Sequence, residues 1–151
     1  MRSISRRHAF RSATVLAIGC NLATVQTVAA GEAPLAIRGY DAVAYFTDGR
    51  PRHGLAEIEY EWDQQRYRFA TADHRELFRA NPTRYAPQFA NFCAMSLSKG
   101  ELVVADPEIW LINDDRLYLF GKPEGPELFR QNLSGNTRDA GENALLLLKK
   151  R

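Results

Sequence analysis

Sulfur and imidazole groups are scarce in this chain of 151 residues, which has two cysteines, two methionines and three histidines. Two cysteines exclude a scaffold held together by disulfides. The chain also lacks a CxxC pair, a glycine-rich phosphate loop and a Ser/His/Asp order typical of hydrolases. No internal repeat or low-complexity run is evident. The contents of 45% hydrophobic and 25% charged residues are those of an ordinary globular protein, which excludes a disordered or fibrous chain.

An excess of charge is lacking as well, once the N-terminal region is considered separately. The net charge of +2 depends on Arg2, Arg6, Arg7 and Arg11, because without these four arginines the chain has 16 basic residues against 18 acidic ones. A domain of that balance lacks the basic surface of a nucleic-acid-binding protein. We therefore expect no nucleic-acid partner.

Residues 1–30 have the pattern of an export signal. The arginines come first, no charged residue lies between Ser12 and Ala30, and Val28-Ala29-Ala30 offers small residues at a cleavage point. Ser5-Arg6-Arg7 fits a loose twin-arginine pattern. We predict a periplasmic or secreted protein that is cleaved near Ala30. A lipoprotein with Cys20 as its lipidated N-terminus and an uncleaved signal anchor are the alternatives.

Residues 31–151 are predicted to form a single α+β domain in which small antiparallel hairpins pack against helices. Between residues 57 and 62 glutamates alternate with Ile58, Tyr60 and Trp62, a period of two that predicts a strand. A turn at Gln64-Gln65 would pair Trp62 with Tyr67, and a second hairpin is expected at 109–120. Helices are predicted from about Thr71 to Asn81, with Leu77 and Phe78 facing inward, and over 126–132 and 138–150. The leucines 145–148 are too few to span a bilayer, so no membrane span is expected in the mature chain.

The order of several short motifs resembles a known family. Gly39-Tyr40-Asp41-Ala42-Val43-Ala44-Tyr45-Phe46 precedes the first hairpin; Phe78, Pro82 and Tyr85 follow with the spacing F-x-x-x-P-x-x-Y; then comes Asn91-Phe92-Cys93-Ala94. This order is similar to that of the exported YHS-domain proteins of bacteria, over residues 35–120. The resemblance implies a YHS-like fold and a relationship to the TRASH metal-binding domains. Cysteine-bearing members of the wider group use three soft ligands, two of which are replaced here by Ala44 and Ala70, while His74 stands at the third position. The exported branch instead has one cysteine after the helix, which matches Cys93.

Cys93 is the residue on which the functional hypotheses depend. The first is a small exported binding module, not a classical enzyme, that holds a soft metal ion through Cys93 with His74 and Met95. Copper is the first candidate, because thiolate and thioether groups select Cu(I). The second is a thiol redox protein whose partner is a small thiol or another protein. It requires a cation or a helix N-terminus near the sulfur, and Lys99 and His74 are the candidates. The third is an interaction domain in which Cys93 is a buried core residue.

The remaining polar residues favour structural roles. We expect Asp41 to form a turn or cap a helix, Tyr85 to pack in the core, and His53 to lie in a loop. No residue is predicted to be catalytic apart from Cys93 in the redox hypothesis.

Overall fold

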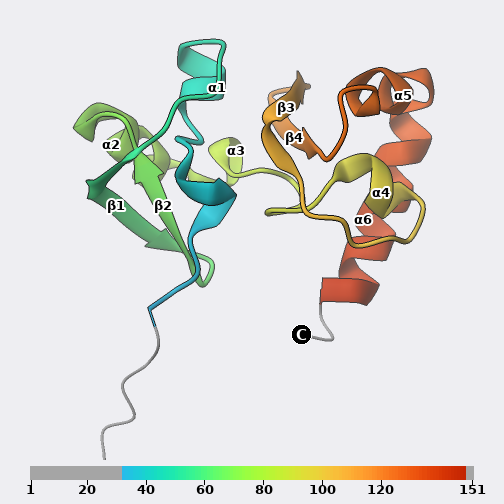
Figure 1. Cartoon of the computed structure of the whole chain (residues 1–151), viewed down its shortest axis with the longest axis horizontal. Coiled ribbons are helices and arrows are strands. Elements are labelled where there is room, and N and C mark those ends of the chain that lie inside the picture. The colour runs from blue at the N-terminus through green and yellow to red at the C-terminus, as the bar shows by residue number, and fades with distance from the viewer. Residues whose placement is uncertain (1–31, 149–151) are drawn as a thin grey trace, which may run out of the picture. The chain divides into compact units, whose positions relative to one another are not determined.

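The computed structural model describes residues 32–148, which form an α+β unit and confirm the predicted fold class. The predicted export signal and Cys20 lie outside the described residues. The elements are η1 (Ala36–Gly39), α1 (Ala44–Thr47), β1 (Leu55–Trp62), β2 (Gln65–Phe69), α2 (Ala72–Ala80), α3 (Pro82–Tyr85), α4 (Ala94–Ser98), β3 (Asp106–Asn113), β4 (Arg116–Phe120), α5 (Gly125–Gln131) and α6 (Leu133–Leu148). β1 pairs with β2 and β3 with β4, which gives two separate antiparallel hairpins (Figure 1).

The first hairpin differs from the prediction in its register. The pairs are Trp62 with Gln65 and Tyr60 with Tyr67, so each residue pairs two positions away from the predicted partner. The turn consists of Asp63 and Gln64, at φ values of 48° and 60°. Two left-handed residues in a row are the conformation of a tight type I′ hairpin turn, and aspartate adopts it more readily than most residues do. A shift of two leaves each side chain on its predicted face.

Helix α2 begins and ends close to the predicted residues. Thr71 is its N-cap, since the Thr71 side chain accepts a hydrogen bond from the backbone N–H of His74. The helix ends at Ala80, and Pro82 opens α3, where a proline without an N–H is tolerated at the first turn. Phe78 is buried as expected, but Leu77 is 43% exposed, so its predicted inward orientation is wrong.

An internal repeat, which the sequence analysis did not find, organises the described residues. Hairpin β3–β4 repeats hairpin β1–β2 in strand length, in its two-residue left-handed turn (Asp114-Asp115) and in a register shift after the first pair. A helix follows each hairpin, α2 or α5. Ten residues between 57 and 81 are identical to those 51 positions later: Glu57/Glu108, Ile58/Ile109, Asp63/Asp114, Tyr67/Tyr118, Phe69/Phe120, Glu76/Glu127, Leu77/Leu128, Phe78/Phe129, Arg79/Arg130 and Asn81/Asn132.

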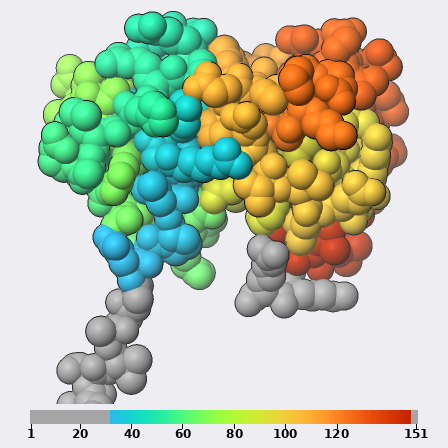
Figure 2. All heavy atoms as spheres, viewed as in Figure 1, coloured from blue at the N-terminus to red at the C-terminus, as the bar shows by residue number. Residues whose placement is uncertain are grey.

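The repeat continues upstream of each hairpin with a spacing of 52. Tyr40 N donates to Ile37 O at 3.0 Å, and Phe92 N donates to Phe89 O at 3.0 Å. Arg38 and Ala90, which correspond to each other, have φ values of 49° and 50°. We call residues 37–81 the first module and residues 89–132 the second module. Figure 2 shows atoms of the first module in blue to green and those of α5 and α6 in orange to red.

Matching aromatic residues form the centre of each module. In the first, the rings of Tyr67 and Phe69 lie 4.5 and 5.2 Å from that of Phe78. In the second, the rings of Tyr118 and Phe120 lie 5.4 and 5.5 Å from that of Phe129. Alternate residues of a strand point to opposite faces, and β4 uses both: Leu117 and Leu119 belong to the core cluster of the first module, Tyr118 and Phe120 to that of the second.

Candidate functional site

Asp41 is a fully buried carboxylate in the first module, and every interaction that it makes is local to that module. Its Oδ1 accepts hydrogen bonds from the backbone N–H groups of Val43 (2.9 Å) and Ala44 (3.3 Å). Its Oδ2 accepts from Ala70 N at 2.8 Å and lies 2.7 Å from His74 Nδ1. Four donors satisfy the carboxylate, as a buried charge requires. This arrangement fits the turn that was one of the two roles expected for Asp41, since Oδ1 accepts from the N–H groups two and three residues later, while Val43 is the N-cap of α1.

The other side of the His74 ring is also occupied. His74 Nε2 lies 3.2 Å from Thr47 Oγ1 and 3.9 Å from Asp48 Oδ1. Thr47 Oγ1 is also within hydrogen-bond distance of Val43 O and Asp48 Oδ1. A hydrogen bond from Arg52 is the main cause that lowers the pKa of Asp48. Although Asp41, His74 and Thr47 lie in the order of a catalytic triad, the hydroxyl has three competing acceptors. The three side chains therefore form a structural polar cluster whose groups bond to one another.

Cys93 occupies in the second module the place that Asp41 has in the first. The backbone N–H of Asp41 donates to Arg52 O at 2.8 Å, and that of Cys93 donates to Val103 O at 2.8 Å. Asp41 accepts from the N–H three residues later, and the Cys93 sulfur likewise accepts from the N–H of Ser96, at 3.5 Å. A thiol therefore replaces the buried carboxylate at the start of the short helix.

Two of the four partners of Asp41, Ala70 and His74, correspond to glycines in the second module. With the spacing of 51, Gly121 corresponds to Ala70 and Gly125 corresponds to His74. A Cβ at Gly125 would lie 2.9 Å from Phe120 Cβ, a distance that real Cβ atoms do not adopt, so the packing of Phe120 selects glycine. Where the first module has an imidazole ring, the second has none.

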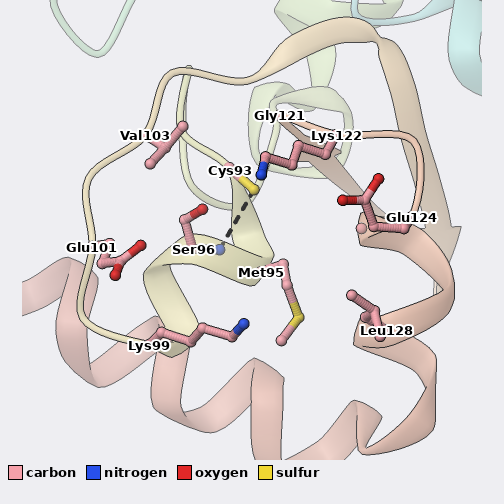
Figure 3. Close-up of a pocket in the computed structure, with 11 residues that line it drawn as sticks. Cys93, Met95, Ser96, Lys99, Glu101, Val103, Gly121, Lys122, Glu124 and Leu128 are labelled. Atoms are coloured by element: carbon pink, nitrogen blue, oxygen red, sulfur yellow. Dashed lines mark hydrogen bonds between the residues drawn. The ribbon is translucent and has the colours of Figure 1, made fainter.

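A pocket of about 310 Å³ lies over Cys93 at this place (Figure 3). That volume is at the small end of the range of small-molecule sites. Cys93 is only 4% exposed, but it is one of the residues that line the pocket. The others are Met95, Ser96, Lys99, Glu101, Val103, Gly121, Lys122, Glu124, Gly125 and Leu128.

Two basic and two acidic side chains surround this pocket, and none of them is paired within the described chain. Lys99 is the C-cap of α4 and Glu101 follows two residues later, while Lys122 and Glu124 come from the loop between β4 and α5. Within residues 32–148 none of the four forms an ion pair with an N···O distance of 4.0 Å or less. In the view of Figure 3 the Lys122 side chain extends toward Cys93. Four charges are thus available to a ligand.

The structure brings together two of the three residues proposed as metal ligands. Cys93 and Met95 line one pocket, whereas His74 is bonded to Asp41 in the other module. Across residues 32–148, no three His, Cys, Asp or Glu side chains lie together in a way that could hold a metal ion. His53 is exposed and its ring lies 4.0 Å from that of Tyr40, consistent with the expected loop position.

Lys122, Gly121 and Gly125 were not found from the sequence as parts of the site. They lie about 30 residues beyond Cys93, and no local motif connects them to it. The signal that would have found them is the spacing of 51, which aligns the two glycines with Ala70 and His74.

In the part of the chain that the structure covers, no helix combines the length and apolarity needed to cross a bilayer. Comparison with protein-family models, with curated proteins and with solved structures found no match in any of the three.

Proposed function

We propose that the chain is a small thiol-exchange protein in which Cys93 is the reactive group. The observation that carries this proposal is the placement of Cys93 on the wall of a pocket that Lys99 and Lys122 also line. Reactive cysteines have a cation nearby and lie on a solvent-filled space, whereas structural cysteines are enclosed by apolar groups. Lys99 and Lys122 are the cations here, and Glu101 and Glu124 balance their charge across the pocket.

The chemistry open to such a site is limited by its single thiol. Cys93 is the one cysteine among residues 32–148 and is free. A thiolate that attacks a disulfide forms a mixed disulfide and releases the other half as a thiolate. Since no second thiol of the described chain stands nearby to resolve that product, a small thiol or a partner protein must do so. The protein would therefore exchange disulfides with other molecules.

The direct test is adduct formation with a small neutral disulfide. The full chain carrying Cys20→Ser is incubated with 2-hydroxyethyl disulfide at neutral pH, and the adduct is quantified by intact mass over time. We expect Cys93 to form the mixed disulfide in native buffer at a rate comparable with or above that of the urea-unfolded chain. Adding Cys93→Ala to this background should abolish the adduct. An adduct that forms only in the unfolded chain would refute the proposal and leave Cys93 a core residue.

Soft-metal binding remains a second candidate, because Met95 lines the same pocket as Cys93. Two sulfur ligands suit Cu(I), and the charges around them are balanced, two lysines against two glutamates. If Cu(I) binds here, Cys93→Ser should abolish binding and Met95→Leu should weaken it, while His74→Asn should leave it unchanged. A competition titration against a chromophoric Cu(I) chelator measures all three. Binding that survives Cys93→Ser would exclude this site.

Membership of the exported YHS-domain family and export of the chain stay predictions. The α+β fold agrees with such membership but is too common to support it alone. Mass spectrometry of the protein recovered from its native compartment would determine whether cleavage occurs near Ala30.

A further inference from the structure

We infer that the pocket over Cys93 takes one half of a small zwitterionic disulfide, such as that of an amino acid or a short peptide thiol. The inference rests on the proposed thiol exchange and names its substrate class. It follows from the space that the second module leaves open and from the signs of the charges around that space.

The space is defined by comparison of the modules. On Asp41 the imidazole of His74 and the backbone N–H of Ala70 both contact the side-chain Oδ2. At the matching positions Gly125 and Gly121 present only backbone. Gly121 and Gly125 line the same pocket as Cys93, so we place a molecule of about the size of an amino-acid side chain in that pocket, beside the sulfur. Met95, Val103 and Leu128 give this space an apolar wall suited to methylene groups.

The charges select a ligand with both signs. Lys99 and Lys122 would attract a purely anionic ligand, but Glu101 and Glu124 would repel it. For a purely cationic ligand the two effects are reversed. Complementary potentials favour a partner and like charges disfavour it. An α-amino acid carries an ammonium and a carboxylate on one carbon, so it can interact with a lysine and a glutamate together. A neutral disulfide gains neither interaction.

The step is an ordinary exchange. The Cys93 thiol gives its proton to solvent, and the sulfur attacks one sulfur of the substrate, RS–SR. A bond forms between Cys93 Sγ and that sulfur as the S–S bond breaks, and the second half leaves as RS⁻, which takes a proton from solvent. Cys93 and one RS group end as a mixed disulfide. No further oxidant or reductant is needed, since the disulfide itself is the oxidant.

The experiment compares four disulfides that differ in charge. The full chain with Cys20→Ser reacts with cystine, with cystamine (cationic), with dithiodiglycolate (anionic) and with 2-hydroxyethyl disulfide (neutral). Each rate is divided by the rate of the same reagent with the urea-unfolded chain, which removes intrinsic reactivity. We expect cystine to exceed the other three by roughly tenfold, the product of two charge interactions with exposed side chains.

Variants connect the preference to the pocket. Lys122→Gln and Glu124→Gln should each reduce the cystine preference, measured as the ratio of the normalised cystine rate to that of the neutral disulfide, roughly three- to fivefold. Glu57→Gln, on the exposed surface of β1 in the first module, is the matched control and should change nothing. Equal normalised rates for all four disulfides would overturn the inference but not the thiol exchange. Failure of the native chain to react with any of them, although the unfolded chain reacts, would overturn both.

Discussion

The two modules share one backbone plan and differ in what fills the same position. In the first, Asp41 is surrounded by backbone donors and capped by His74, whose ring contacts Thr47 on its other side. In the second, Cys93 receives one weak hydrogen bond to its sulfur and faces a pocket. The repeat therefore has one copy in which the buried group is enclosed by polar partners and one in which a buried thiol lines a pocket. The difference depends on three positions: aspartate or cysteine, alanine or glycine, and histidine or glycine.

The comparison of Asp41 with Cys93 also shows how differently the stability of the fold depends on the two positions. A buried charge is tolerated only when hydrogen bonds satisfy it, so the first module must keep the hydrogen bonds that Asp41 accepts. A thiol is a small apolar group that is buried at little cost, so the second module can leave its surroundings open.

The largest effect is expected from removal of the buried carboxylate. Asp41→Ala leaves three backbone N–H groups without their acceptor and should lower the free energy of unfolding by about 3 kcal/mol or more. Cys93→Ala at the matching position should cost about 1 kcal/mol. Urea unfolding followed by circular dichroism measures both. Equal losses of unfolding free energy in the two variants would contradict the structural difference between the fully hydrogen-bonded Asp41 and the weakly bonded Cys93.

The next effect tests why the second module has no side chain where His74 stands. Gly125→Ala places a Cβ 2.9 Å from Phe120, and such overpacking should cost about 1–3 kcal/mol. Gly141→Ala in α6, where a Cβ would meet nothing within 4 Å, is the control and should stabilise the helix by up to about 1 kcal/mol. A neutral Gly125→Ala would show that Phe120 does not enforce glycine there.

A pH effect is expected from the core cluster of the first module. Burial raises the pKa of Tyr45 and of Tyr67 above the usual value of 10.0. Both phenols are protonated in either state below pH 10, but above it the unfolded chain ionises first. Stability should therefore fall above pH 10 by up to about 1.4 kcal/mol per pH unit for each tyrosine. Unfolding at pH 9 and 11 measures this slope, and Tyr67→Phe should reduce it by one tyrosine's share.

The smallest effect on stability should accompany a clear effect on reactivity. In Gly121→Ala the new Cβ would lie 3.4 Å from Val103 Cγ1 and 3.7 Å from Cys93 Cβ, ordinary contacts that fill part of the pocket. We expect the free energy of unfolding to change by less than about 0.5 kcal/mol, while Cys93 alkylation in the native protein slows. An unchanged alkylation rate would mean that reagents reach the sulfur by another route.

Local patterns in the sequence predicted most of the fold. The alternation at residues 57–62, the second hairpin and the stop at Asn81-Pro82 each depend on neighbouring residues, and all three were found. The predicted register of the first hairpin was wrong because Asp63 and Gln64 form a left-handed turn, which the identity of these two residues does not require. Leu77 was placed inward because a single helix pattern does not reveal which partners the helix has.

The site was predictable only in part. Cys93 and Met95 are close in sequence, so their shared pocket follows from local structure. Lys122 and Gly125 reach the pocket through the fold of the second hairpin, which no short motif encodes. His74 was grouped with Cys93 because both are metal-ligand types, yet they belong to different modules. The repeat shows that Cys93 corresponds to the partner of His74.

The most direct test of the central claim is how Cys93 alkylation depends on urea well below the unfolding transition. If the pocket gives access to the sulfur in the folded state, the iodoacetamide rate of the Cys20→Ser chain should be independent of urea in that range. A sulfur that is reached only through global unfolding would give a rate that rises with urea by the full m-value of unfolding. That second result would contradict the account and assign Cys93 to the core.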